Sequence, residues 1–145
     1  MSYCTVVDIQ NIVPEQDLIE LTDDTLPPAM VDQDRVDRAI SDAGELIDGS
    51  LRGRYTLPLT PVPGLINTLA VDLAIYRLYS RRIKLTPPEV VGERHKEALK
   101  LLEQIRSGRI SLGTESTGGD PTPDAGGPQI SAPDRVFSRK TLEDY

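Results

Sequence analysis

The feature that most constrains this chain is a predicted helix over residues 65–82 that is apolar around nearly its whole circumference. Successive residues of an α-helix advance by about 100°, which places Leu65, Ile66 and Leu78 on three different sides of it. On a protein surface, one of those sides would stay in water. The sequence therefore predicts a bundle with this helix buried at its centre.

Four further segments show the one-sided pattern of helices that cover such a centre. Asp32 is a good N-cap for a helix ending near residue 51, and a helix is expected over 88–107, with Pro88 in its first turn and Gly108 ending it. Two short helices are expected, one starting near Val6 and one over 15–21. The long stripes consist of Val36, Ile40, Ala43, Ile47 and Leu51, and of Val91, His95, Ala98, Leu102 and Ile105. The predicted fold class is all-α, a small bundle of about five helices.

The composition changes after residue 112. Residues 114–129 hold four Gly, three Pro, three Thr and one Ser, and no apolar residue larger than Ala. Such a segment buries too little surface to offset the entropy of ordering it. We therefore expect a helical domain over 1–112, a flexible linker over 113–129 and a C-terminal docking arm over 130–145. The linker and the docking arm together form an extended, Gly/Pro-rich C-terminal segment.

Apolar residues return in the arm, where Ile130, Val136 and Phe137 flank Arg135. An apolar segment on a tether is typical of a docking peptide. We expect Ile130, Val136 and Phe137 to be the anchors and Arg135 to be a polar contact, ordered only against another subunit. The alternative is that the arm folds back onto its own domain.

Charge is distributed unevenly along the chain. Residues 1–50 contain twelve acids and two bases, a net charge of −10. Residues 51–112 have a net charge of +6, and residues 113–145 a net charge of −3. Opposite charges could pair within one molecule or orient a contact between neighbouring copies, or each face could simply be solvated. The overall acidity argues against a sequence-reading DNA-binding protein.

Few residues are suited to catalysis or metal binding. The lone histidine, His95, lies on an apolar stripe, where a half-buried core residue is expected. The lone cysteine, Cys4, excludes an intrachain disulfide and a cysteine-based zinc site. Asp72 lies inside the central helix, so we expect it to face a basic side chain or a backbone donor. No cofactor, metal or catalytic site is predicted, and we expect a protein that is not an enzyme.

The start of the chain does not resemble a signal peptide, and no apolar run could span a bilayer.

Several motifs, in order, resemble those of a family of small tail-neck proteins from Mu-like transposable phages and prophages. These motifs are Met-Ser-Tyr-x-Thr-Val-x-Asp at 1–8, Leu-Ile-Glu-Leu-Thr-Asp at 18–23, Ile-Asp-Gly-Ser-Leu-x-Gly-Arg-Tyr-x-Leu-Pro-Leu at 47–59, Asp-Leu-Ala-Ile-Tyr-Arg-Leu-Tyr at 72–79, Gly-x-Ile-Ser-Leu-Gly at 108–113 and Ser-Ala-Pro-x-Arg-Val-Phe at 131–137. They are specific as a set, and they cover nearly the whole chain.

The resemblance implies a head–tail connector, or adaptor, of the virion neck that is made in the cytoplasm of the bacterial host. Such proteins are small helical bundles that form a ring, usually of twelve copies, below the portal protein. The implied partners are the portal, neighbouring copies and a stopper or tail-completion protein, with genomic DNA passing through the lumen without sequence-specific binding. The acidic half could line that lumen without gripping DNA.

Three other hypotheses remain open from the residues. A DNA-touching helical module would use the basic run of Arg77, Arg81, Arg82 and Lys84. A stopper-like completion protein is also possible, because only the family resemblance, and no residue pattern, distinguishes it from an adaptor. A small enzyme would need His95, Asp72 and Cys4 to converge.

Overall fold

The computed structural model describes residues 2–114 of the 145-residue chain. This part contains five helices and no strand, which confirms the predicted all-α class. The helices are α1 (Val6–Gln10), α2 (Glu15–Thr22), α3 (Gln33–Leu51), α4 (Gly64–Ser80) and α5 (Glu89–Arg106). None of them is long and apolar enough to cross a membrane.

The helix boundaries follow local sequence signals. Thr5 and Asp8 form a reciprocal capping box at the start of α1, and the Asp32 side chain accepts a hydrogen bond from the backbone N–H of Arg35 at the start of α3. The central helix ends at Ser80, two residues before the predicted end, and Pro88 precedes α5 as its N-cap residue instead of lying inside it. Differences of this size are ordinary, because helix ends fray.

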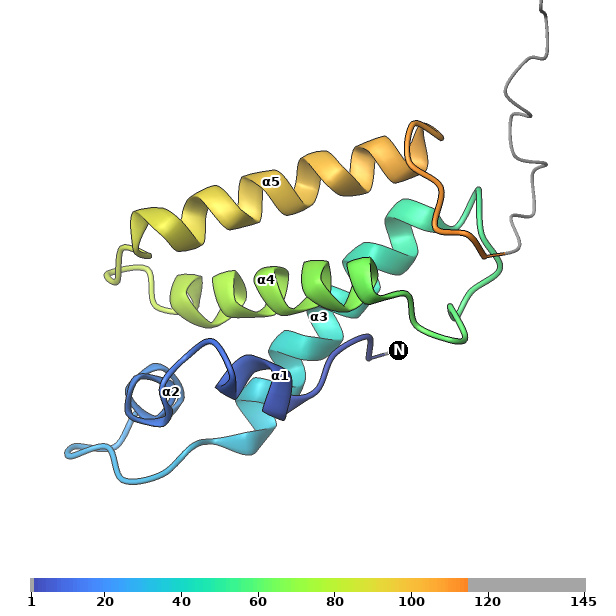
Figure 1. The fold of residues 1–145 in the computed structure, drawn as a ribbon. Coiled ribbons are helices and arrows are strands. Elements are labelled where there is room, and N and C mark those ends of the chain that lie inside the picture. The colour runs from blue at the N-terminus through green and yellow to red at the C-terminus, as the bar shows by residue number, and fades with distance from the viewer. Residues whose placement is uncertain (1, 115–145) are drawn as a thin grey trace, which may run out of the picture.

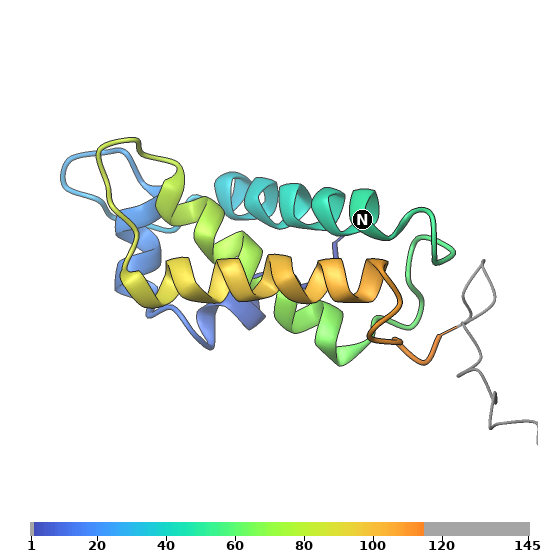
Figure 2. The same ribbon diagram turned by 90° about the horizontal axis from the view of Figure 1, so that it is seen from above.

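Helix α4 lies at the centre of the bundle, with α5 along one side and α3 crossing it on another (Figure 1). In the view of Figure 2, α4 passes obliquely behind α5. Eight residues of α4 are buried, among them Ile66, Leu69 and Leu73, each no more than 2% exposed. Burying one such side chain contributes about 1.5–3 kcal/mol, so this helix supplies much of the core.

Both predicted stripes point inward. All five residues of the α3 stripe are buried, as are Ala98, Leu102 and Ile105 of α5. Val91 and His95, nearer the start of α5, are only partly buried. The core is thus mainly aliphatic, as the composition predicts, and it also includes the side chains of Tyr3 and Tyr55.

Helix α5 ends in a Schellman motif. Gly108 has a φ of +83°, its N–H donates to the Ile105 carbonyl, and the N–H of Arg109 donates to the Gln104 carbonyl at 2.9 Å. A Cβ at Gly108 would lie 2.5 Å from Nη1 of Arg54. Glycine is favoured here by the left-handed backbone conformation, whereas the guanidinium group is the end of a flexible side chain that could move aside.

The N-terminal segment is fixed to the bundle by Tyr3. Its side chain is 2% exposed, its hydroxyl donates to a carboxylate oxygen of Asp48 on α3, and the Leu59 N–H donates to the same hydroxyl. Asn67 on α4 donates to the backbone carbonyl of Tyr3 at 3.0 Å. These contacts, which no local pattern predicts, hold α1 against α3 and α4.

The predictions for the C-terminal region fall mostly outside the described residues. The linker over 113–129 is described only at Gly113 and Thr114, and the docking arm over 130–145 is not described. The last described segment returns to the bundle, because the N–H of Leu112 donates to the Tyr55 hydroxyl at 3.2 Å.

Candidate functional site

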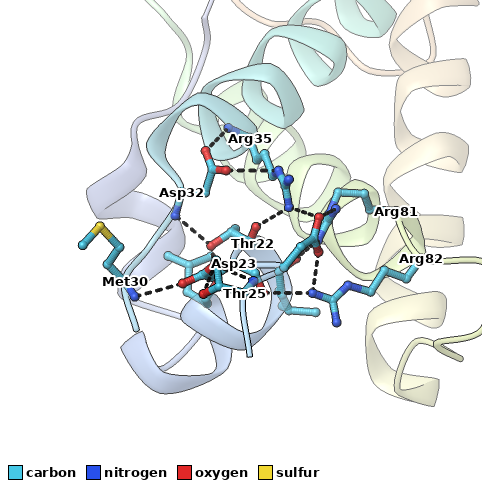
Figure 3. A network of polar contacts seen from close by, with 11 residues as sticks. Thr22, Asp23, Thr25, Met30, Asp32, Arg35, Arg81 and Arg82 are labelled. Carbon is cyan, nitrogen blue, oxygen red and sulfur yellow. Dashed lines mark hydrogen bonds and ion pairs between the residues drawn. The ribbon is translucent and has the colours of Figure 1, made fainter. Parts of the chain in front are cut away.

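A cluster of ion pairs joins the loop after α2 to α3 and to the end of α4 (Figure 3). Asp24 lies at its centre. Arg81 contacts it at two points, Nη2 to Oδ1 at 2.8 Å and Nη1 to Oδ2 at 3.1 Å. Arg82 Nη2 lies 2.7 Å from Oδ1, and Arg35 also donates to this carboxylate. The carboxylate of Asp24 thus binds three arginines, one near the start of α3 and two just after the end of α4.

The same arginines satisfy backbone carbonyls that the end of α2 leaves without helical partners. Arg35 donates to Thr22 O at 2.6 Å, Arg81 to Leu21 O at 2.9 Å, and Arg82 to Asp23 O at 3.0 Å. Hydrogen bonds from Arg81, with smaller contributions from Arg35 and Arg82, hold the pKa of the Asp24 carboxyl well below its usual range. The cluster therefore acts as an electrostatic clasp between two loops.

Asp23 shapes the loop itself. Its carboxylate accepts hydrogen bonds from the backbone N–H groups of Ala29, Thr25 and Met30. These bonds hold the pKa of Asp23 well below its usual range. The buried hydroxyl of Thr22 accepts a further bond from the N–H of Asp32, next to α3.

The clasp changes how the basic run should be interpreted. Arg81 and Arg82, which the DNA-binding hypothesis uses, are engaged with Asp24. Arg77 is exposed and forms no ion pair within the described part of the chain. The sequence contained the opposite charges, but nothing in it showed which residues would meet across about sixty positions.

A hollow opens between α3 and the C-terminal half of α4, and we call it the arginine hollow. Its lining residues are Arg35, Arg38, Ala39, Asp42, Arg77, Leu78, Ser80 and Arg81. Arg35 and Arg81 belong to the clasp, whereas Arg38 and Arg77 are exposed and make no ion pair among residues 2–114. Positive charge is therefore available at this surface for an anionic partner.

A second hollow lies where α2 and the start of α5 approach α4, and we call it the carboxylate groove. Its lining residues are Ile12, Val13, Pro14, Asp17, Asp72, Ile75, Tyr79, Val90, Val91 and Arg94. Ile12 is 44% exposed and Val90 is 63% exposed, so apolar surface faces solvent at its rim. Asp17 is exposed on α2.

Asp72 lies in the carboxylate groove and meets a basic partner, as the sequence predicts. Its Oδ1 lies 3.0 Å from Nη2 of Arg94 on α5, yet this buried oxygen accepts no hydrogen bond of good geometry. Burial raises the pKa of the Asp72 carboxyl, Arg94 opposes this rise, and the nearby charge of Glu97 adds to it. Asp17 and Asp72 thus give the groove acidic character beside one arginine, and Glu97, which follows the lining residue Arg94 by one turn of α5, adds negative charge next to the groove.

The residues that an enzyme would need lie in different surroundings. His95 stacks on Tyr76, with ring centroids 3.7 Å apart, and burial followed by the charge of Arg77 lowers its pKa. Cys4 is buried, and desolvation with a smaller effect of Asp8 raises the pKa of its thiol to about 11. A neutral, buried thiol is a poor nucleophile. Within the described residues, no group of three or more His, Cys, Asp or Glu side chains is placed to hold a metal ion.

The docking residues predicted from the sequence are not placed by the structure. Ile130, Arg135, Val136 and Phe137 lie outside the described residues. The two hollows and the clasp are the surface features that sequence reasoning missed. The only advance signal was the opposite net charge of residues 1–50 and 51–112.

Comparison with known proteins identifies relatives over nearly the whole chain. The family model described as Bacteriophage Mu, Gp36 matches residues 3–131. Gene product J of Escherichia phage Mu is 30% identical over 140 residues, which cover 97% of this chain and 96% of that protein. Mu-like prophage FluMu protein gp36 of Haemophilus influenzae is 30% identical over 121 residues, covering 83% of this chain and 82% of that protein. The family match includes all five helices and ends before Arg135.

Proposed function

Because this chain belongs to the Bacteriophage Mu, Gp36 family, we propose that it is a structural protein of the phage neck, a head–tail connector (adaptor). Copies of it form a ring below the portal protein, extend the DNA channel and provide a docking surface for the next neck or tail protein. The protein is made in the cytoplasm of the bacterial host and becomes part of the virion neck.

The observation that carries this proposal is the end-to-end match with a phage Mu gene product. A match that covers 97% of one chain and 96% of the other is expected of proteins with one common architecture, not of a shared small module. It supports the family resemblance carried by the motifs at 1–8, 47–59, 72–79 and 131–137. That resemblance implies the adaptor role.

The described residues fit a part that transmits and joins rather than one that reacts. The polar cluster around Asp24 satisfies backbone carbonyls and joins loops, which are structural tasks. His95 stacks on Tyr76, Asp72 pairs with Arg94, and Cys4 is buried elsewhere, near the start of the chain. We therefore propose a protein without catalytic activity.

Charge supports the idea of a ring around DNA. The acidic half of the chain, at −10, suits a lumen wall along which DNA slides without being gripped. A head-to-tail ring repeats one contact between two different surfaces, so each copy must present both. In this proposal the C-terminal arm, with Ile130, Val136 and Phe137 as anchors and Arg135 as a polar contact, docks on the portal, on a stopper protein or on a neighbouring copy.

Deletion of the gene tests the proposal directly. We expect cells that carry the phage without it to accumulate filled heads and free tails, and the purified protein to bind isolated heads that bear the portal. Tailed virions in normal numbers without the gene, together with no binding to those heads, would overturn the adaptor role.

Truncation after Leu112 tests the arm. We expect the truncated protein to keep the thermal stability of the bundle and to lose assembly on portal-bearing heads. Unchanged assembly would rule out docking by the arm.

A DNA-touching module remains the second candidate because Arg38 and Arg77 lie exposed at the arginine hollow and form no ion pair with any residue of the described part, 2–114. In that case the protein would be retained on duplex DNA at low salt and released as salt increases. A stopper-like role would instead place the protein on the tail-proximal side of another neck ring in images of the virion.

A further inference from the structure

The two hollows open on opposite sides of α4. The arginine hollow uses Arg77 and Arg81, whereas the carboxylate groove uses Asp72, Ile75 and Tyr79. Arg77 and Tyr79 are two positions apart, which on an α-helix places their side chains about 160° apart around the axis. One molecule therefore presents these surfaces in opposite directions.

The charges of the two surfaces are complementary. Arg38 and Arg77 lack ion-pair partners within residues 2–114. On the other side, Asp17 is exposed, and Glu97 is exposed and close enough to Asp72 to raise the pKa of its carboxyl. Arg94 offsets part of this acidity. The groove keeps an excess of negative charge, and the hollow keeps an excess of positive charge.

The apolar residues fit the same arrangement. Ile12 and Val90 expose large parts of their side chains at the rim of the carboxylate groove. The arginine hollow has Ala39 and Leu78 in its lining, and arginine stems can cover apolar surface while their guanidinium groups reach a carboxylate. Such a contact would bury apolar area and pair charges together.

We propose that the arginine hollow of one copy receives the carboxylate groove of the next copy, with Arg38 and Arg77 facing Asp17 and Glu97. The occupant of each surface is thus a second copy of this chain. The contact joins two different surfaces, so it repeats head to tail and closes into a ring when the rotation between copies allows. This inference rests on the proposed ring function and names the residues that build the ring.

Charge reversal tests the pairing in complementation of a phage that lacks the gene. We expect R38E/R77E and D17R/E97R each to lower the yield of tailed virions by about tenfold or more, because like charges then face each other. We expect the variant with all four substitutions to recover most of that yield, because the charges again match. R52E and E93R are the matched controls, because both residues are exposed and lie outside the two hollows.

A cross-linking experiment on portal-bearing heads tests proximity without reversing any charge. Cys4 is buried, so cysteines introduced by D17C and R38C would be the reactive thiols. We expect oxidation of the D17C/R38C protein on heads to give a ladder of covalent multimers, whereas either single variant gives at most dimers. Circular dichroism of each variant confirms that the helices are formed.

The outcomes separate this inference from the adaptor role. Failure of the unmodified protein to bind heads would overturn the adaptor role. Normal binding of the unmodified protein, with no ladder and no recovery in the fourfold variant, would overturn only the proposed contact. Loss of retention on duplex DNA in R38E/R77E with normal ring assembly would also overturn it, because the hollow would then bind phosphate groups.

Discussion

Arg81 at the end of α4 forms a bidentate contact with Asp24, which lies 57 positions earlier in the sequence. Nη2 of Arg81 lies 2.8 Å from Oδ1 of Asp24, and Nη1 lies 3.1 Å from Oδ2. This geometry is the strongest form of an arginine–carboxylate contact, because two parallel hydrogen bonds fix the orientation as well as the distance. Arg35 and Arg82 join the same carboxylate. Two loops far apart in the chain are thereby held at one end of the bundle.

Asp24→Asn should weaken this clasp. The Asp24 carboxyl has a lowered pKa in the folded protein, so its stabilisation is present above the ordinary pKa of about 4 and is lost as pH falls through the lower folded value. We expect D24N to unfold at lower urea than the parent at pH 7, and this difference to shrink as pH falls below 4. E45Q, a change at an exposed carboxylate on α3, serves as the control and should have little effect at either pH.

Tyr3→Phe should loosen the N-terminal segment by removing the hydroxyl that contacts Asp48 and Leu59. We expect a loss of about 1–3 kcal/mol in the free energy of unfolding, measured with urea at pH 7, since one bond goes to a carboxylate. Burial, followed by the hydrogen bond to Asp48, raises the pKa of Tyr3 to about 12. The parent should therefore lose stability as pH rises from about 10 to about 12, and Y3F should lose less. An identical alkaline decline in both proteins would contradict this role of Tyr3.

Cys4 should react slowly with thiol reagents in the folded protein. It is 4% exposed, and burial raises the pKa of its thiol to about 11, so little thiolate exists at pH 8. We expect alkylation by iodoacetamide at pH 8 to be at least tenfold slower in buffer than in 6 M urea, because a thiol with a pKa of about 11 has roughly a hundredfold less thiolate at pH 8 than a thiol with its ordinary pKa. Equal rates in both conditions would show that the segment carrying Cys4 does not pack as described.

Gly108→Ala should destabilise the end of α5. The backbone there has a φ of +83°, and a Cβ would lie 2.5 Å from Nη1 of Arg54. We expect a loss of about 1–2 kcal/mol, measured by thermal or urea unfolding, since a left-handed conformation is costly for alanine. Gly92→Ala is the matched control on the same helix, where a Cβ meets nothing within 4 Å, and it should stabilise by up to about 1 kcal/mol.

Leu73→Ala should show how much the central helix contributes. Leu73 is 1% exposed on α4, so truncation removes buried surface and leaves a cavity. We expect a loss of about 2–5 kcal/mol in urea unfolding. Ile83→Ala is the control, because Ile83 is fully exposed after α4 and its truncation should change stability very little.

The local sequence was enough to predict the helices and the faces they bury. The capping box at Thr5 and Asp8, the N-cap at Asp32 and the glycine stop at Gly108 all occur where the pattern placed them. The even apolar distribution of 65–82 identified the central helix, although it ends at Ser80. The docking residues Ile130, Arg135, Val136 and Phe137 stay a prediction, because they lie outside the described residues.

The positions of the helices and the apolar side of each could be predicted from local sequence, because helical periodicity and capping depend on neighbours within a few positions. The folded structure was needed to show that Asp24 meets Arg81, that Tyr3 meets Asp48, and that the two hollows open on opposite sides of α4. Those relationships depend on how whole helices cross and how loops close. Many partners of equal charge were available along the chain, and packing of the apolar faces selected among them.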